Sequence, residues 1–201
     1  MISFRTNYLG KYIKSFAALI VAAATVCYNL EASELNFLGR QKNITATFPF
    51  EQGPGYLPGG KKFPYSLKNE FGKEFRLSDL HEKVVIVVLS TTWCPNCPTV
   101  LRSFDNLIHR LKQSGIENVE ILVLNVGNET LGALRLYYKS NDIQLLKIYP
   151  SVKPNVMEGI AGVPACLVFD KKGNHVWGYL GGGVDYAGND FFDFIERLAH
   201  E

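Results

Sequence analysis

One segment constrains the fold of this chain more than any other: an unbroken apolar run followed at once by two closely spaced cysteines. Residues 84–89 are four valines, one isoleucine and one leucine, with no polar side chain among them. Such a run is typical of a strand that is buried on both faces of a sheet. The motif Trp93-Cys94-Pro95-Asn96-Cys97 follows, and apolar residues at helical spacing come after it. The two cysteines are therefore expected where a central strand passes into a helix.

The start of a helix favours a reactive cysteine. The first N–H groups of a helix have no partner within it, and the helix dipole places partial positive charge there. A thiolate at Cys94 would be stabilised in this position, and Cys97, one turn later, can close a disulfide with it. Pro95 fits the first helical position, where its missing N–H costs nothing. We expect this helix to run from about residue 95 to 113 and to end at Gly115.

Two other uses of a C-x-x-C pair are disfavoured. Two cysteines at this spacing also form half of a zinc site, but Cys27, Cys166 and the four histidines supply no second pair at ligand spacing. A purely structural bridge across one helical turn would remove little chain entropy, so it would stabilise the fold poorly. Redox chemistry is the preferred interpretation.

The first 32 residues are typical of an export signal. Three basic residues precede an apolar, Ala-rich segment at 16–27, and cleavage is expected near Ala32. This segment is shorter than the roughly 20 residues of a spanning helix, although an uncleaved membrane anchor stays an alternative. Removing residues 1–32 leaves equal numbers of acidic and basic side chains, which argues against nucleic acid or an anionic membrane as partner. We expect the periplasm, or the outer face of a bacterial inner membrane, where disulfides persist.

The rest of the chain divides into an irregular arm and one domain. Residues 33–62 are rich in Gly and Pro and read as a linker or arm, whose aromatic residues, Tyr56 among them, indicate that it lies against the domain. Within residues 63–201 we expect a hairpin turn around Asn69 and Gly72. Further strands are expected at 119–126, 166–170 and 175–180, and helices at 130–140 (burying Leu131, Leu134, Leu136 and Tyr138) and 190–199. This order predicts an α/β fold with a mixed sheet flanked by helices.

Several motifs of residues 63–201 form a pattern that occurs in one protein family. They are Phe63-Pro64-Tyr65-Ser66-Leu67, residues 69–80, residues 83–87, Thr92-Trp93-Cys94, Gly162-Val163-Pro164-Ala165 and residues 169–173. With these motifs the chain resembles the exported thioredoxin-like proteins of the TlpA/ResA type. The resemblance implies a three-layer thioredoxin-like fold with an N-terminal hairpin extension. It also implies a redox-active Cys94–Cys97 disulfide and no further cofactor or metal.

The resemblance also implies roles for residues around the cysteines. Cys94 is expected to attack a target disulfide and Cys97 to resolve the mixed disulfide. The Val163–Pro164 bond is expected to be cis and to lie beside the sulfurs, with the backbone of Val163 pairing with substrate as a short added strand. Trp93 is expected at the edge of the core, where it screens Cys94 and contacts substrate. Pro95 and Asn96, between the cysteines, are expected to tune the redox potential.

The function implied is that of a thiol–disulfide oxidoreductase that acts on protein dithiols or disulfides. The favoured version is a reductase in cytochrome c or oxidase maturation that receives electrons from a membrane donor. An oxidase that works in the opposite direction is one alternative. The other is an assembly protein that holds Cu(I) with the same cysteines, to which His175 or Cys166 would add a third ligand. His175 follows a predicted turn, however, and is expected in solvent.

The chain departs from the family pattern beneath the cysteines. Val88 stands where many relatives carry a buried polar side chain, so a carboxylate proton shuttle is absent there. Glu70 or Glu158 could replace it, although each is expected to be a surface charge. Cys166 lies two residues after Pro164, and we expect it to be a buried thiol that behaves as a small hydrophobe.

Overall fold

The computed structural model describes residues 56–57, 66–69, 71–152 and 160–201. All of them fall within the unit Thr47–Glu201. The predicted export signal and most of the predicted arm lie outside the described residues, as do Glu70 and Glu158. None of the described helices is long and apolar enough to cross a membrane.

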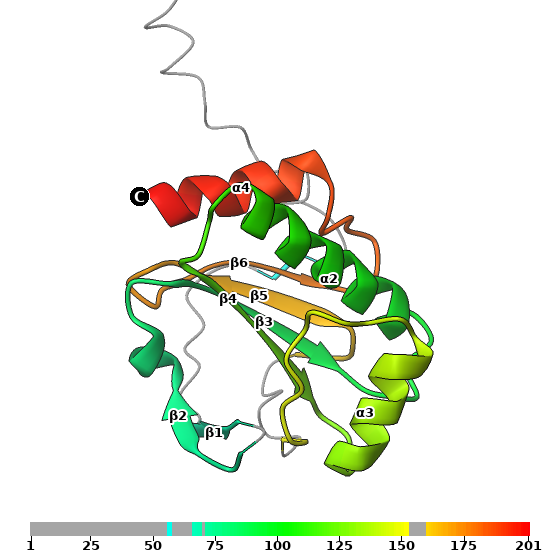
Figure 1. Cartoon of the computed structure of the whole chain (residues 1–201). Coiled ribbons are helices and arrows are strands. Elements are labelled where there is room, and N and C mark those ends of the chain that lie inside the picture. The colour runs from blue at the N-terminus through cyan, green and yellow to red at the C-terminus, as the bar shows by residue number, and fades with distance from the viewer. Residues whose placement is uncertain (1–55, 58–65, 70, 153–159) are drawn as a thin grey trace, which may run out of the picture. The chain divides into compact units, whose positions relative to one another are not determined.

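The centre of the fold is a four-stranded mixed sheet in the order β4-β3-β5-β6. β3 (Val84–Ser90) is the predicted apolar strand, and all seven of its residues are buried. It pairs in parallel with β4 (Val119–Asn125) and antiparallel with β5 (Ala165–Phe169). β6 (His175–Leu180) completes the sheet beside β5 (Figure 1). The predicted mixed sheet is confirmed.

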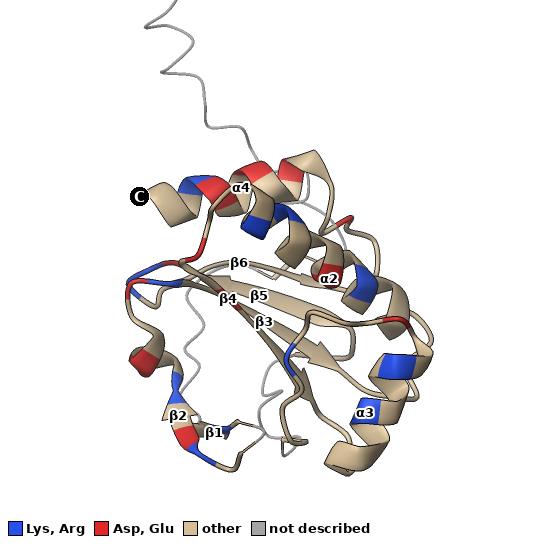
Figure 2. Ribbon diagram, viewed as in Figure 1, with Lys and Arg blue, Asp and Glu red and all other residues tan. Residues whose placement is uncertain are grey.

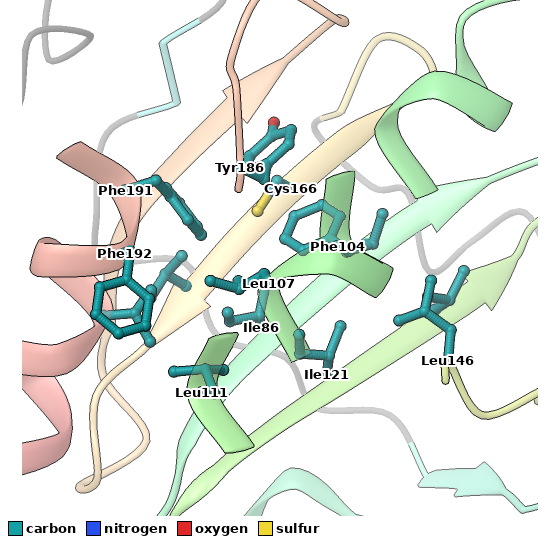
Figure 3. Close-up of a cluster of buried hydrophobic side chains, with 14 of the residues drawn as sticks. Ile86, Phe104, Leu107, Leu111, Ile121, Leu146, Cys166, Tyr186, Phe191 and Phe192 are labelled. Atoms are coloured by element: carbon teal, nitrogen blue, oxygen red, sulfur yellow. The ribbon is translucent and has the colours of Figure 1, made fainter. Parts of the chain in front are cut away.

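Helices cover one face of this sheet. Val84, Ile86 and Val88 point to this face, where they join a cluster that includes residues of α2 (Cys97–Gln113) and α4 (Asn189–His200). Figure 3 shows side chains of both helices meeting those of the sheet in this cluster. The outer side of α4 carries charge, with Asp190, Asp193 and Arg197 exposed (Figure 2).

A hairpin contributes to the cover of the opposite face. β1 (Ser66–Lys68) and β2 (Glu74–Arg76) are antiparallel, and a single 3-10 turn, η1 (Leu77–Leu80), follows them. The predicted turn is confirmed, because the side chain of Asn69 accepts hydrogen bonds from the backbone of Phe71 and Lys73 and Gly72 adopts φ +79°. Apolar side chains of the hairpin and η1 join those of β3 that point to this face, which are Val85, Val87 and Leu89. Helices, sheet and hairpin thus form three layers.

The long helix α2 differs from its prediction at its start and agrees at its end. Its first residue is Cys97 and its N-cap is Asn96, so Pro95 lies before the helix and Pro98 is the proline of the first turn. The chain offers two prolines three residues apart, and the later one lies in the first turn of α2. At the other end Gly115 has φ +70°, and the N–H of Ile116 reaches the carbonyl of Leu111, which is a Schellman termination.

The short helix α3 (Leu131–Ser140) also corrects one prediction. Thr130 caps it by accepting a hydrogen bond from the N–H of Ala133. Leu134 and Tyr138 are buried as predicted and Leu131 is half-buried, whereas Leu136 is 70% exposed. Residues two apart lie on opposite sides of a helix, so Leu136 cannot share the face of Leu134 and Tyr138.

The end of the predicted arm contacts the domain. Tyr56 forms a β-bridge with Tyr179, and the N–H of Leu57 donates to the carbonyl of Gly178. Both partners belong to β6, so residues 56–57 pair with β6 on the edge that does not face β5. The expectation that the arm lies against the domain is confirmed for Tyr56.

The packing of α2 on α4 generates a first test. Phe104 is fully buried, stacks on Tyr186 at 4.2 Å between ring centroids and meets Phe191 edge-on. We expect Phe104→Ala to lower the free energy of unfolding by about 3–5 kcal/mol, because it leaves a cavity among aromatic rings. The matched control is Phe71→Ala, which removes an 86% exposed ring and should change it by less than about 0.5 kcal/mol. Equal losses in urea unfolding would contradict this account of the core.

Candidate active site

The two cysteines lie where β3 ends and α2 begins. They form a disulfide with their Cα atoms 5.4 Å apart. β3 ends at Ser90, and the N–H of Cys94 then reaches back to the carbonyl of Thr91 at 3.4 Å. Cys97, the first residue of α2, is completely buried, and Cys94 is only 3% exposed. Both cysteines are therefore buried at the rim of the core, and only Cys94 keeps any exposure.

Exposed side chains surround Cys94. Trp93 is 73% exposed, and Pro95 and Asn96 are also exposed. The prediction that Trp93 lies at the edge of the core is wrong, because both its neighbours Thr92 and Cys94 turn inward and leave the indole in solvent. A protein that approaches the disulfide would meet this indole, which suits the predicted role of Trp93 in substrate contact.

Pro164 lies at the same edge of the sheet. The Val163–Pro164 bond is cis, as expected, and the carbonyl of Pro164 accepts a hydrogen bond from the N–H of Gly181 at 2.8 Å. The residue after Pro164 pairs with Leu89, one residue from the end of β3. The cis proline and the cysteines are thus brought together by strand register. Val163 is half-buried, and its role in binding substrate stays a prediction.

A glycine loop that the sequence patterns did not single out also borders the site. Gly181, Gly182 and Gly183 follow β6, and Gly181 has φ +111°. A Cβ atom added at Gly182 would lie 3.4 Å from the Cβ of Asn96 and 3.9 Å from Val100. The loop therefore packs against the turn between the cysteines. Three glycines directly after a strand are the signal that could have marked it.

The third described cysteine, Cys166, lies in the core beside Val88. Strand pairing places these two residues opposite each other, and both are fully buried. Burial raises the pKa of the Cys166 thiol well above its usual value, and a hydrogen bond with Tyr186 offsets this only in part. Figure 3 shows the sulfur of Cys166 among the apolar side chains between sheet and helices, close to Tyr186. The expectation of a buried thiol in an apolar setting is confirmed.

The carboxylate that approaches the active-site turn comes from Glu129. Its Oε1 accepts a hydrogen bond of 2.5 Å from the hydroxyl of Thr92 and one of 3.4 Å from the backbone N–H of Thr92. Val88 carries no such group, and Glu70 and Glu158 lie outside the described residues. The signal for Glu129 was its place just after β4, since parallel neighbouring strands end at the same edge of a sheet.

His175 does not join the site. It is buried, at 4% exposure, and its ring packs on that of Phe169, so the prediction of a solvated histidine is wrong. His175 pairs with Phe169 of β5, and Ala165, four residues before Phe169, lies at the cysteine edge of the sheet. Four residues of a strand span about 13 Å, so His175 lies about that far from the cysteine edge. Among the described residues no three His, Cys, Asp or Glu side chains gather as a metal site.

The fold and the site define a thioredoxin-like protein: a mixed sheet with a C-x-x-C disulfide at the strand-to-helix junction and a cis proline at the same edge. Residues 59–174 match the AhpC/TSA family, which is more than half of the chain. The chain belongs to this family, and the predicted thioredoxin-like fold is confirmed.

Solved structures with this fold include three named thiol-exchange proteins or thioredoxins. The thioredoxin domain of a thiol-disulfide oxidoreductase from Bacteroides vulgatus is 17% identical, with a TM-score of 0.56 over 71% of this chain and 99% of that chain. A secreted thiol-disulfide isomerase from Corynebacterium glutamicum is 20% identical, with a TM-score of 0.54 over 68% and 84%. The exposed lipoprotein thioredoxin of Streptococcus pneumoniae is 20% identical, with a TM-score of 0.51 over 68% and 98%.

The burial of the three cysteines predicts an order of reactivity. In the reduced native protein we expect iodoacetamide to modify Cys94 first, since Cys97 and Cys166 are completely buried. Cys166 should react only after denaturation, because burial also raises its pKa and keeps it a neutral thiol. Peptide mass mapping after timed alkylation measures this order. Native labelling of Cys166 as fast as that of Cys94 would contradict the buried position of Cys166.

Proposed function

We propose that the protein is an exported thiol–disulfide oxidoreductase that reduces disulfides in other proteins. The observation that carries the proposal is the Cys94–Cys97 disulfide at the junction of β3 and α2, with Cys97 enclosed and Cys94 at the rim. Such a pair stores two electrons as a dithiol and releases them when the disulfide forms.

The two cysteines have different roles in this reaction. The thiolate of Cys94 attacks one sulfur of the target disulfide, a new S–S bond forms, and the other target sulfur leaves as a thiolate. Cys97 then loses its proton and attacks Cys94, which releases the second target thiolate. The target gains two electrons, the enzyme is left with its disulfide, and the released thiolates take protons from water. Burial of Cys97 supports this order, because a target sulfur reaches Cys94 first.

The surroundings of Cys94 suit a protein substrate. The exposed indole of Trp93 offers an apolar contact, and Val163, next to the cis proline, can pair its backbone with an extended segment of the substrate. Gly182, in the glycine loop beside Asn96, is also exposed there.

Export and the reducing direction come from the sequence and its resemblance. The N-terminal signal predicts a location outside the cytosol, and similar structures named as a secreted isomerase and an exposed lipoprotein thioredoxin support it. In that compartment a reductase needs a donor, and a membrane electron donor fits the resemblance to the TlpA/ResA type. Cytochrome c or oxidase maturation is the process that this resemblance favours.

The roles of the cysteines can be separated with two serine variants. We expect the purified protein to reduce insulin disulfides, and Cys94→Ser to lose at least about 99% of this activity, since Cys97 and Cys166 are completely buried and cannot replace the attacking thiol. Cys97→Ser should instead trap a mixed disulfide with the substrate, visible as a reducible band on gel electrophoresis.

Two results would overturn this proposal. One is an absence of dithiol turnover, with Cys94→Ser indistinguishable from the unchanged protein. The other is tight stoichiometric Cu(I) binding by the reduced protein that disappears in Cys97→Ser while reductase activity is absent, which would favour the copper assembly role.

The residues between the cysteines predict the redox potential. Neither Pro95 nor Asn96 is basic, so no side chain between the cysteines stabilises a thiolate further. We therefore expect a potential nearer to that of thioredoxin, about −270 mV, than to that of DsbA, about −120 mV. Asn96→His should raise the potential by roughly tens of millivolts, because an imidazolium stabilises the reduced form. Equilibration with glutathione measures it. The control is Asn106→His, exposed further along α2, which should leave it unchanged.

A further inference from the structure

Several buried polar atoms at the end of β3, on α3 and on Glu129 have no hydrogen-bond partner among the described residues. Oε2 of Glu129 is buried and has no hydrogen-bond partner among the described residues. The hydroxyls of Ser90, Thr91 and Tyr137 are buried and unpartnered in the same way within the described part of the chain. Ser90 and Thr91 lead directly from β3 into the active-site turn. A buried polar atom without a partner is costly, so such a group marks a place with a function of its own.

The backbone that carries Glu129 is held firmly. The hydroxyl of Ser151 donates to the carbonyl of Glu129 at 2.8 Å, and Oδ1 of Asn125 accepts from the N–H of Gly127 at 2.9 Å. The N–H of Val126 donates to the carbonyl of Ser90, which ties this loop to the end of β3. The carboxylate is therefore presented from a fixed support and not from a free side chain.

Room for the carboxylate is built into the loop. A Cβ atom added at Gly127 would lie 2.0 Å from Oε2 of Glu129, closer than any real contact. The φ angle of Gly127 is not positive, so the backbone conformation does not require a glycine here. The absence of a side chain instead leaves room for the carboxylate. Any larger residue here would displace the carboxylate from Thr92.

Tyr137 on α3 is the titratable group whose pKa records the nearby charges of Glu129 and Arg102. Burial chiefly raises the pKa of Tyr137 on α3; the positive charge of Arg102 on α2 opposes this, and Glu129 raises it further. Tyr137 thus stays a neutral phenol beside Glu129, while Arg102 is exposed and engaged with Thr99. None of these neighbours forms a direct ion pair with the carboxylate among the described residues.

We propose that Glu129 is a positioning residue of the redox site, which fixes the active-site turn through Thr92 and places a negative charge that disfavours the thiolate of Cys94. It would take over part of the role of the buried carboxylate that Val88 cannot provide. Thr92 lies two residues before Cys94, and its hydroxyl holds Oε1 of Glu129 at 2.5 Å, so the carboxylate is anchored next to the active-site turn. A like charge near a thiol raises its proton affinity, and a less stabilised thiolate makes the pair a stronger reductant.

This inference rests on the proposed function, but its test does not need turnover. The variant is Glu129→Gln, which keeps an acceptor for the Thr92 hydroxyl and removes only the charge. The rate of alkylation of reduced Cys94 is measured against pH, together with the potential of the Cys94–Cys97 pair. We expect alkylation at pH 7 to become roughly two- to tenfold faster, the pH midpoint to move down and the pair to become more oxidising.

Two further variants make the result specific. Gly127→Ala keeps the charge but pushes it away from Thr92, so it should shift the pH profile in the same direction. Glu117→Gln removes a charge from an exposed glutamate just before β4, at the end opposite the cysteines, and should shift neither quantity.

Three outcomes would overturn the inference. They are an unchanged profile and potential in Glu129→Gln, a shift in the opposite direction, and a loss of thermal stability with no redox change, which would make the contact merely structural. A protein whose profile shifts as expected but which reduces no disulfide would instead overturn the proposed function and leave this inference standing.

Discussion

Burial of β3 on both faces is the constraint on which the rest of this fold depends. Every residue of the strand is buried, and both of its edges are occupied by β4 and β5. The side chains of β3 point to both faces of the sheet, and both faces must be covered. α2 and α4 help to cover one face, and the β1–β2 hairpin helps to cover the other. Because every side chain of β3 is buried in the core, a reactive group next to this strand can reach the surface only where the chain leaves the sheet. The disulfide lies at that exit.

Features of the fold that depend on a few neighbouring residues could be predicted from the sequence. The apolar run, the turn at Asn69 and the end of α2 at Gly115 each depend on a few neighbouring residues, and each is confirmed. The errors were also local. Pro95 and Pro98 both suit a first helical turn, and α2 uses the later one. Leu136 was assigned to the buried face although the spacing of Leu134 and Tyr138 already places it on the other side of α3.

Contacts across the chain were the part that sequence patterns missed. Thr92 and Glu129 are 37 residues apart, and Asn96 and Gly182 are farther still. They meet because β3 and β4 run in parallel to one edge and β6 returns to the same edge beside β5. Conversely, register separates His175 from the cysteines although its chemistry suits a metal ligand. Strand order and register, once known, explain each of these placements.

The corrected start of α2 changes the electrostatics expected at Cys94. A helix that began at Pro95 would place this cysteine at the N-cap, whereas the observed N-cap is Asn96, two residues later. The influence of the helix dipole is confined to the terminal turn, so Cys94 gains less from it than the sequence alone predicted. In our proposal the carboxylate of Glu129, hydrogen-bonded to Thr92, acts in the same direction, because it disfavours a second negative charge nearby. Both features favour the protonated dithiol, and a dithiol whose thiolate is little stabilised gives up its electrons more readily. The proposed reducing direction rests on the family resemblance, and the potential of the Cys94–Cys97 pair tests it.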